Sequence, residues 1–201
     1  MSDRHQHWES VYASKGEAEL SWTQAAPALS LQLIEEVCPP GERVIDIGGG
    51  ASPLAARLLA RGYSVTVLDI SEAALQRARQ QIGPRAEHVH WSTADVTKCP
   101  DLGLFEVWHD RAVFHFLTSA ADRAAYVDLL SRTVPAGGHA IIATFALDGP
   151  EKCSGLPVRR YDGKMLAAEL GPGFKLLKTV PERHRTPWGA PQSFQYSVFE
   201  L

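Results

Sequence analysis

The stretch that decides the fold is Val44-Ile45-Asp46-Ile47-Gly48-Gly49-Gly50-Ala51-Ser52-Pro53. A short apolar run ends in glycines, and the Ser-Pro pair that follows is typical of the start of a helix. Glycines between a strand and a helix let the backbone approach a ligand closely at the carboxyl end of a parallel sheet. We therefore expect a ligand-binding loop directly after a strand over residues 44–47.

Strands and helices alternate on both sides of this loop. Residues 64–68 and 140–145 are short apolar runs of the kind found in strands buried on both faces, and weaker strands are expected at 88–91 and 105–109. Helical patterns lie between them, after Ser52, after Ser71 and after Ser119. This alternation predicts an α/β fold with a doubly wound sheet. Since no repeat or low-complexity linker interrupts it, residues 1–201 are predicted to form a single domain.

The C-terminal part follows a different pattern. Residues 174–180 and 193–200 are both predicted to be strands, joined by a loop over 181–191. Two strands with no helix between them predict an antiparallel hairpin at one edge of the sheet. An ordinary dinucleotide-binding fold continues with parallel strands instead.

The composition excludes several classes of protein. Twenty basic and 23 acidic residues are interspersed, which argues against nucleic acid as the main partner. No apolar stretch approaches the ~20 residues of a membrane span, and the polar N-terminus does not resemble a signal peptide. Three cysteines without a C-x-x-C pattern predict a reduced, cytoplasmic protein. His88 and His90 share a strand face, but no third ligand has metal spacing near them, so no metal site is expected.

The glycine loop does not fit a dinucleotide. The fingerprint G-x-G-x-x-G would place its third glycine at Pro53, and Asp46 would repel a pyrophosphate. A carboxylate there suits a cationic ligand, such as S-adenosylmethionine (SAM), which carries an ammonium, a sulfonium and no phosphate. Asp69 ends the second strand, 23 residues after Asp46, and can accept hydrogen bonds from both hydroxyls of a ribose.

Four segments together resemble the motifs of class I SAM-dependent methyltransferases. They are Val44–Gly50, Leu68–Ser71, Thr93–Val96 and Pro135–Gly138, and the resemblance covers roughly residues 29–146. It implies a Rossmann-like, seven-stranded sheet, mostly parallel with an antiparallel last strand, and SAM bound over the carboxyl ends of the first four strands. Ser52 departs from the pattern, because many members have a third glycine there, and Ala136 is an insertion.

The resemblance also implies a set of cofactor-binding residues. Gly48 and Gly50 flank the methionine part of SAM near Asp46, Asp69 holds the ribose, Ile70 covers the adenine, and Asp95 binds the adenine amine beside Val96. Segments around Trp8 and Trp22 resemble those that form a lid over SAM in several small methyltransferases, including protein-lysine ones. Trp22 is therefore predicted to contact the cofactor, and residues 1–27 to form an N-terminal lid. The alternative for both tryptophans is simple packing against the sheet.

Catalytic groups are expected at the end of the fourth strand. Methyl transfer is an in-line displacement, which needs alignment, exclusion of water and, where the nucleophile carries a proton, a base. His109, Asp110 and Arg111 follow apolar strand residues and are the predicted catalytic residues. His109 is either a base or a cofactor contact, and Asp110 and Arg111 can instead pair with each other or cap the next helix. His115, which is alternatively a core histidine, and Arg159 are the predicted substrate-binding residues.

The order of three further motifs resembles that of one group of methyltransferases. Asp110-Arg111, then Arg123-xx-Tyr126, then a Gly155–Val158 loop partly resemble thiopurine and thiol methyltransferases, although Cys153 lies outside that pattern. We therefore predict a SAM-dependent methyltransferase acting on a small molecule, with a thiol as the favoured acceptor. The alternatives are a protein-lysine N-methyltransferase and a SAM-binding protein without catalysis. The oligomeric state is left open.

Overall fold

A seven-stranded sheet in the order β3-β2-β1-β4-β5-β9-β8 forms the centre of the protein. The structure is a computed structural model that describes residues 3–201, so the first two residues of the predicted lid lie outside the described residues. The strands are β1 (Arg43–Ile47), β2 (Ser64–Asp69), β3 (Val89–Thr93), β4 (Val107–Arg111), β5 (His139–Phe145), β8 (Lys175–Arg185) and β9 (Pro191–Glu200). The first five run parallel, whereas β9 is antiparallel to both β5 and β8. The predicted fold class is confirmed.

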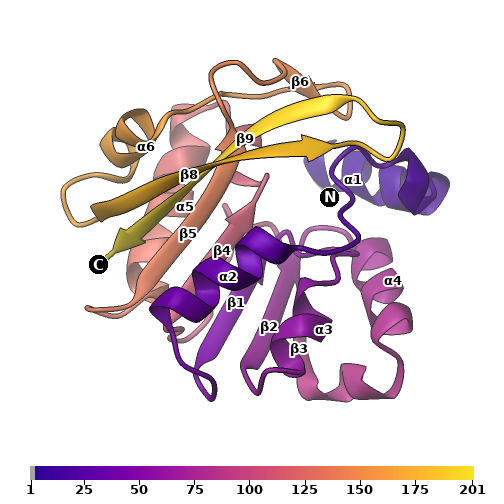
Figure 1. Cartoon of the computed structure of the whole chain (residues 1–201), viewed down its shortest axis with the longest axis horizontal. Coiled ribbons are helices and arrows are strands. Elements are labelled where there is room, and N and C mark those ends of the chain that lie inside the picture. The colour runs from indigo at the N-terminus through magenta and orange to yellow at the C-terminus, as the bar shows by residue number, and fades with distance from the viewer. Residues whose placement is uncertain (1–2) are drawn as a thin grey trace.

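Helices cover both faces of the sheet (Figure 1). One face packs against α2 (Ala28–Val37), α3 (Leu54–Leu59) and α4 (Glu72–Ile82), and the other against α5 (Ala120–Thr133) and α6 (Gly163–Leu170). Neighbouring residues of β1 face opposite ways: Val44 packs into the first layer, and Ile45 packs into the second. Both layers bury apolar side chains, which explains why β1, β2 and β5 are mostly apolar.

The predicted helix starts are found with their caps. The Ser71 hydroxyl accepts from the Ala74 amide, and the Ser119 hydroxyl accepts from the Asp122 amide. Helix α3 begins at Leu54, after Pro53 in the N-cap position. The Ser52 hydroxyl accepts from the Leu54 amide at 3.2 Å, so Ser52 satisfies the first amide of the helix.

The C-terminal hairpin is longer than its sequence suggests. The predicted loop over 181–191 is wrong, because β8 continues to Arg185, β9 begins at Pro191, and only residues 186–190 connect them. Pro181 is tolerated because β8 is an edge strand, where a missing amide donor costs no ladder bond. His184 is buried, which gives this extension of β8 an inner face.

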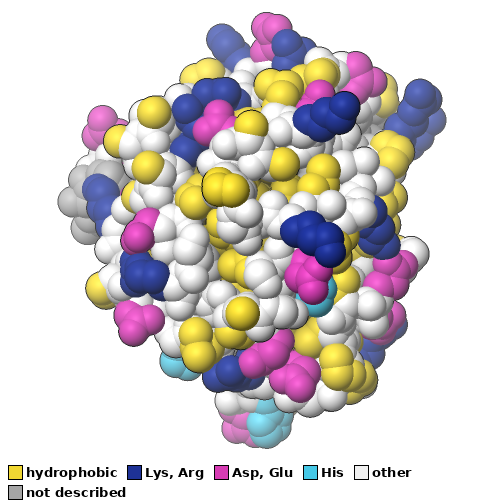
Figure 2. Space-filling model, turned by 90° about the vertical axis from the view of Figure 1, so that its left-hand side faces the viewer, with side chains coloured by type: hydrophobic (Ala, Val, Ile, Leu, Met, Phe, Trp, Pro, Cys, Tyr) yellow, Lys and Arg dark blue, Asp and Glu magenta, His cyan; other side chains and the backbone are white. Residues whose placement is uncertain are grey.

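The remaining elements are short or lie at the N-terminus. They are α1 (Asp3–Ser14), the 3-10 turns η1 (Glu17–Glu19), η2 (Gly83–His88) and η3 (Phe114–Phe116), and a two-stranded ribbon of β6 (Lys152–Cys153) and β7 (Leu156–Pro157). No helix among residues 3–201 is long and apolar enough to cross a membrane. Figure 2 shows one face on which basic and acidic side chains are interleaved.

Candidate functional site

Two adjoining cavities open at the carboxyl ends of the parallel strands. The first cavity has about 720 Å³ of space not filled by atoms and the second about 600 Å³, open solvent included. The two cavities share Tyr12, Trp22, Gly48 and Arg111. Predicted cofactor residues line both: Trp22, Gly48, Asp69, Ile70, Asp95 and Val96 the first, and Trp22, Asp46 and Gly48 the second.

At two positions of the glycine loop, a side chain would collide with neighbouring residues, and Gly50, unlike Gly48, lines neither cavity. Gly48 has a φ of +66°, and a Cβ there would lie 2.1 Å from a methyl carbon of Val113. Gly50 has a φ of +39°, and its Cβ would lie 2.9 Å from the Tyr12 hydroxyl and 3.0 Å from a carboxylate oxygen of Asp69. Both positions therefore require glycine for conformation and for space.

Asp69 is a buried carboxylate at the end of β2. Complete burial raises its pKa to about 7, and the negative charge of Asp46 adds to the rise, while the Ser71 amide, which donates to it at 2.8 Å, lowers it. Asp69 lines the first cavity and can accept from hydroxyl groups bound there. Asp95, on the loop after β3, accepts from the Thr97 amide at 3.0 Å and lies 3.5 Å from the Arg4 guanidinium.

Helix α1 roofs the first cavity. Arg4, Trp8 and Tyr12 are spaced four residues apart, share one helix face and all line the cavity. The Trp8 ring lies edge-on to Phe116 and Trp22, at centroid distances of 5.0 and 5.6 Å. This helix was not predicted from the sequence, although the four-residue spacing of Arg4, Trp8 and Tyr12 was the available signal.

Glu9 connects helix α1 to the start of helix α4. Its carboxylate accepts from the Ser71 hydroxyl at 2.8 Å and from the Ala73 amide at 3.2 Å, at the start of α4. The Ser71 amide in turn donates to Asp69. Ser71 therefore connects the predicted lid segment to Asp69, the carboxylate that is expected to hold the ribose.

His109 and Asp110 lie on opposite sides of β4. The Nδ1 atom of His109 lies 2.7 Å from a carboxylate oxygen of Asp46, its register partner on β1, and both side chains are buried. Asp110 lines neither cavity, because its carboxylate accepts from the Tyr126 hydroxyl and from the amides of Val113 and Phe114. Burial raises the pKa of Asp110 to about 6, although the hydrogen bonds from these three donors lower it. Asp110 therefore shapes the turn after β4.

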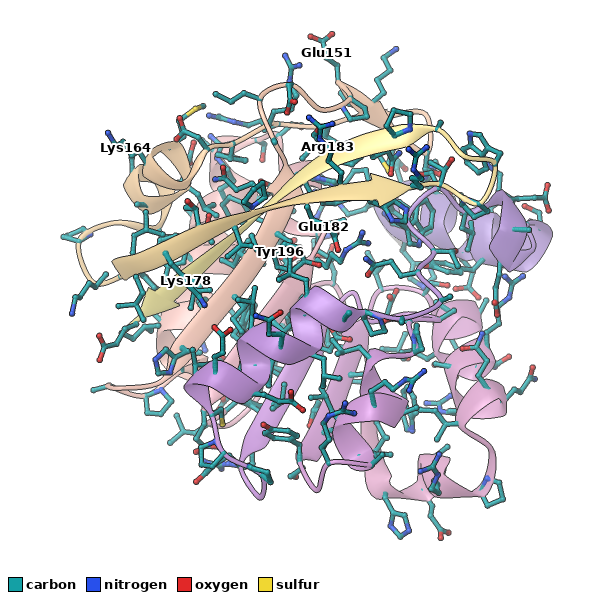
Figure 3. The ribbon with its side chains drawn as sticks, viewed as in Figure 1. Glu151, Lys164, Lys178, Glu182, Arg183 and Tyr196 are labelled. Atoms are coloured by element: carbon teal, nitrogen blue, oxygen red, sulfur yellow. The ribbon has the colours of Figure 1, made fainter. Side chains whose placement is uncertain are left out.

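Arg111 lies where the two cavities meet. Its guanidinium donates to the Trp22 carbonyl at 3.1 Å and to Glu182 on β8 at 3.2 Å, and stacks over Phe194 at 4.3 Å. Gln24 donates to the same Glu182 carboxylate at 3.0 Å. Figure 3 shows Glu182 on β8 near the centre of the view, whereas Glu151 and Lys164 lie at the rim. The Arg111 side chain is 10% exposed, and its Nε has no hydrogen-bond partner within residues 3–201.

The two predicted substrate-binding residues, His115 and Arg159, contact each other through their backbones. His115 is fully buried, its Nδ1 accepts from the Phe145 amide at 3.3 Å, and burial followed by the charge of Arg111 lowers its pKa to about 3. The Arg159 amide donates to the His115 carbonyl at 2.8 Å, and its guanidinium pairs with Glu169. Neither residue lines either cavity. Their part in substrate binding stays a prediction.

Cys153 is a cavity residue to which the sequence assigned no role. It lines the first cavity, and burial raises the pKa of its thiol to about 11. Its place on β6 brings a loop from the C-terminal third of the chain to the same cavity as Trp8. Among residues 3–201, no group of His, Cys, Asp and Glu side chains could hold a metal ion.

The fold and the site together define a class. A Rossmann-like sheet with an antiparallel last strand, a glycine loop beside a carboxylate and a second carboxylate after β2 are the features of a class I SAM-dependent methyltransferase. Residues 44–138 match the family model of a methyltransferase domain. This match covers a little under half of the chain, and together with the fold it supports a class I SAM-dependent methyltransferase.

Similar proteins are found by sequence and by structure. The chain is 33% identical over 105 residues to the ubiquinone biosynthesis O-methyltransferase of Alkalilimnicola ehrlichii, a match that covers 52% of this chain and 42% of that protein. The chain thus spans less than half of that curated relative. A structure described as "Conversion of a Disulfide Bond into a Thioacetal Group during Echinomycin Biosynthesis" has a TM-score of 0.77 at 20% identity, covering 98% of this chain and 92% of the other.

A second solved structure resembles the chain over almost its whole length. It is the 1,6-didemethyltoxoflavin-N1-methyltransferase of Burkholderia thailandensis with bound 1,6-didemethyltoxoflavin and S-adenosylhomocysteine, at a TM-score of 0.71 and 18% identity, covering 98% of this chain and 86% of that one. At such identities, the likeness to both structures shows the fold.

Proposed function

We propose that this protein transfers the methyl group of SAM to a small-molecule acceptor. The observation that carries the proposal is the pair of adjoining cavities, with Asp69 in one, Asp46 in the other and Arg111 lining both. The relative named as an O-methyltransferase and the neighbour that binds a small heterocycle support a small acceptor.

The residues present fit SAM. Gly48 lines both cavities and carries no side chain, so a ligand can lie close against its backbone. Asp69 suits the ribose, and Ile70, Asp95 and Val96 suit the adenine. When bound, SAM supplies a methyl carbon already activated by the sulfonium. The chain therefore needs to orient the acceptor and exclude water, since activation of the carbon comes with the cofactor.

The roof of α1 is suited to excluding water. Trp8 and Trp22 close over the first cavity, and both Arg4 and Glu9 hold α1 in place by charged contacts, Arg4 with Asp95 and Asp122. We propose that residues 3–27 act as a lid that admits the cofactor when it opens.

A thiol is the proposed acceptor. The thiolate is the reactive form of a thiol, and a cation beside it lowers its pKa. Arg111 is such a cation, with an unpartnered buried Nε, in a cavity whose other walls include Trp8, Phe116 and Cys153.

An oxygen acceptor is the second candidate. The name of the curated relative favours it, and Arg111 would stabilise a phenolate in the same way as a thiolate. The experiment that decides is mass spectrometry of the purified protein with SAM and matched panels of thiols, phenols, amines and peptides. We expect S-methyl products. O-methyl products alone would replace the thiol by the second candidate, and methylated lysine alone would favour the protein substrate.

Two variants test the role of Arg111. Arg111→Gln should lower the rate and move the pH–rate profile to higher pH, because the acceptor then has to ionise without the nearby cation. Arg160→Gln is the matched control, since Arg160 pairs with Glu151 and lines neither cavity. An unshifted profile in Arg111→Gln would contradict the role of Arg111. SAM binding without any methylated product in any panel would favour the non-catalytic alternative.

A further inference from the structure

The buried Asp46–His109 pair lines the second cavity and has one hydrogen-bonding position without a partner among residues 3–201. Asp46 and His109 are register partners on β1 and β4, their side chains are 4% and 2% exposed, and both line this cavity. The Nε2 atom of His109 is buried and has no hydrogen-bond partner within residues 3–201. A buried polar atom left without a partner is costly, so such an atom on a cavity wall indicates a ligand.

The contact with Asp46 determines what this atom can do. An ionised carboxylate only accepts hydrogen bonds, so the Nδ1 atom of His109 carries the hydrogen that points to Asp46. In the neutral imidazole the Nε2 atom then holds a lone pair. With the imidazole neutral, His109 therefore offers an acceptor, held in direction by Asp46, that a donor on the ligand would satisfy.

The charges around the second cavity favour a cationic donor. Its lining includes the carboxylates of Asp46 and Glu17. Within residues 3–201, Arg111 is the one Lys or Arg that lines this cavity, and its charge is opposed by Glu182 at 3.2 Å. A positively charged group is therefore more favourable here than an anion.

We propose that the His109 Nε2 atom accepts a hydrogen bond from the α-ammonium of the methionine part of SAM, with Asp46 holding the imidazole in place. The inference rests on the proposed function. It makes His109 a cofactor-binding residue, in place of a general base, because His109 lines the second cavity and is absent from the lining of the first, where Trp8, Phe116 and Cys153 lie. An acceptor that carries a proton would then lose it to solvent before the methyl transfer.

The test compares three nucleosides by calorimetry. They are S-adenosylhomocysteine, its analogue without the α-amino group and its analogue without the carboxylate. The wild-type protein should bind S-adenosylhomocysteine about tenfold or more tighter than the deamino analogue, the scale of a charge-assisted hydrogen bond. In His109→Phe this preference should fall below about threefold. His139→Phe is the control, because His139 lines neither cavity, and the preference should be unchanged.

Each contrary outcome has a separate meaning. Equal binding of S-adenosylhomocysteine and the deamino analogue by the wild-type protein would overturn the inference without relying on a variant. A His109→Phe protein that loses only its preference over the decarboxy analogue would show a protonated His109 that binds the carboxylate, and would also overturn it. Failure of the wild-type protein to bind any of the three would overturn the proposed function itself.

Discussion

Lowering the pH from 8 to 6 should weaken the binding of a nucleoside to this protein about tenfold, through Asp69. Burial raises the pKa of this carboxyl to about 7, and the charge of Asp46 adds to the rise. Only the ionised carboxylate can accept from both ribose hydroxyls. With a pKa of about 7, roughly a tenth of the carboxyl is ionised at pH 6 and roughly nine tenths at pH 8, which gives the tenfold change.

The assay is calorimetric titration with 5′-methylthioadenosine at several pH values between 6 and 8. This nucleoside keeps the ribose and the adenine but lacks the amino-acid part, so no group of the ligand titrates in this range. Asp69→Asn is the matched variant, because it keeps the shape of the side chain and removes the titration. It should bind more weakly at pH 8 and show no dependence on pH.

The same pKa has a consequence for folding whose sign can be checked. Between about pH 4 and pH 7 the ligand-free folded protein keeps a proton on Asp69 that the unfolded chain has released, so this group lowers the free energy of unfolding as the pH rises. Bound nucleoside should remove that trend, because Asp69 is then ionised in the folded state as well. A wild-type affinity that is constant from pH 6 to pH 8, or an equal slope in Asp69→Asn, would refute the reasoning.

Three further predictions concern the loop, the turn and the lid. Gly50→Ala should weaken the binding of S-adenosylhomocysteine in calorimetry, because the new Cβ would crowd Tyr12 and Asp69, whereas Gly103→Ala, also at positive φ but in open space, should leave the affinity unchanged. Asp110→Asn should lower the free energy of unfolding in urea by about 1–3 kcal/mol, since an amide cannot accept all three hydrogen bonds; an unchanged midpoint would contradict this. Amide exchange over Asp3–Ser14 should slow when S-adenosylhomocysteine binds, and equal exchange with and without the ligand would count against a lid.

The parts of the fold that are predictable from the sequence are those specified locally. The loop at Gly48 follows from a strand, a glycine pair and a helix start within ten residues, and Asp69 follows from its place at the end of the next strand. The serine caps at Ser71 and Ser119 depend on residues three positions away. Each of these signals lies within one turn or one strand end, so no knowledge of distant contacts is needed.

The parts that escape prediction depend on contacts between distant segments. The pairing of Asp46 with His109 depends on the register of β1 against β4, 63 residues apart, and the sequence marks neither residue as a partner of the other. Helix α1 has few apolar residues because its inner face covers a cavity instead of a core, so its pattern does not resemble an amphipathic helix. The hairpin extends through Pro181 because a neighbouring strand is present on only one side of β8.

The wall of the first cavity joins two kinds of chain segment. Gly48, Asp69 and Asp95 come from residues 44–138, the range shared with other methyltransferase domains, whereas Trp8 and Cys153 come from outside it. Substitutions outside residues 44–138 can therefore change the cavity wall while Gly48, Asp69 and Asp95 stay in place. Selection for a new acceptor would act mainly on the two ends of the chain, and libraries aimed at changing substrate range should be concentrated there.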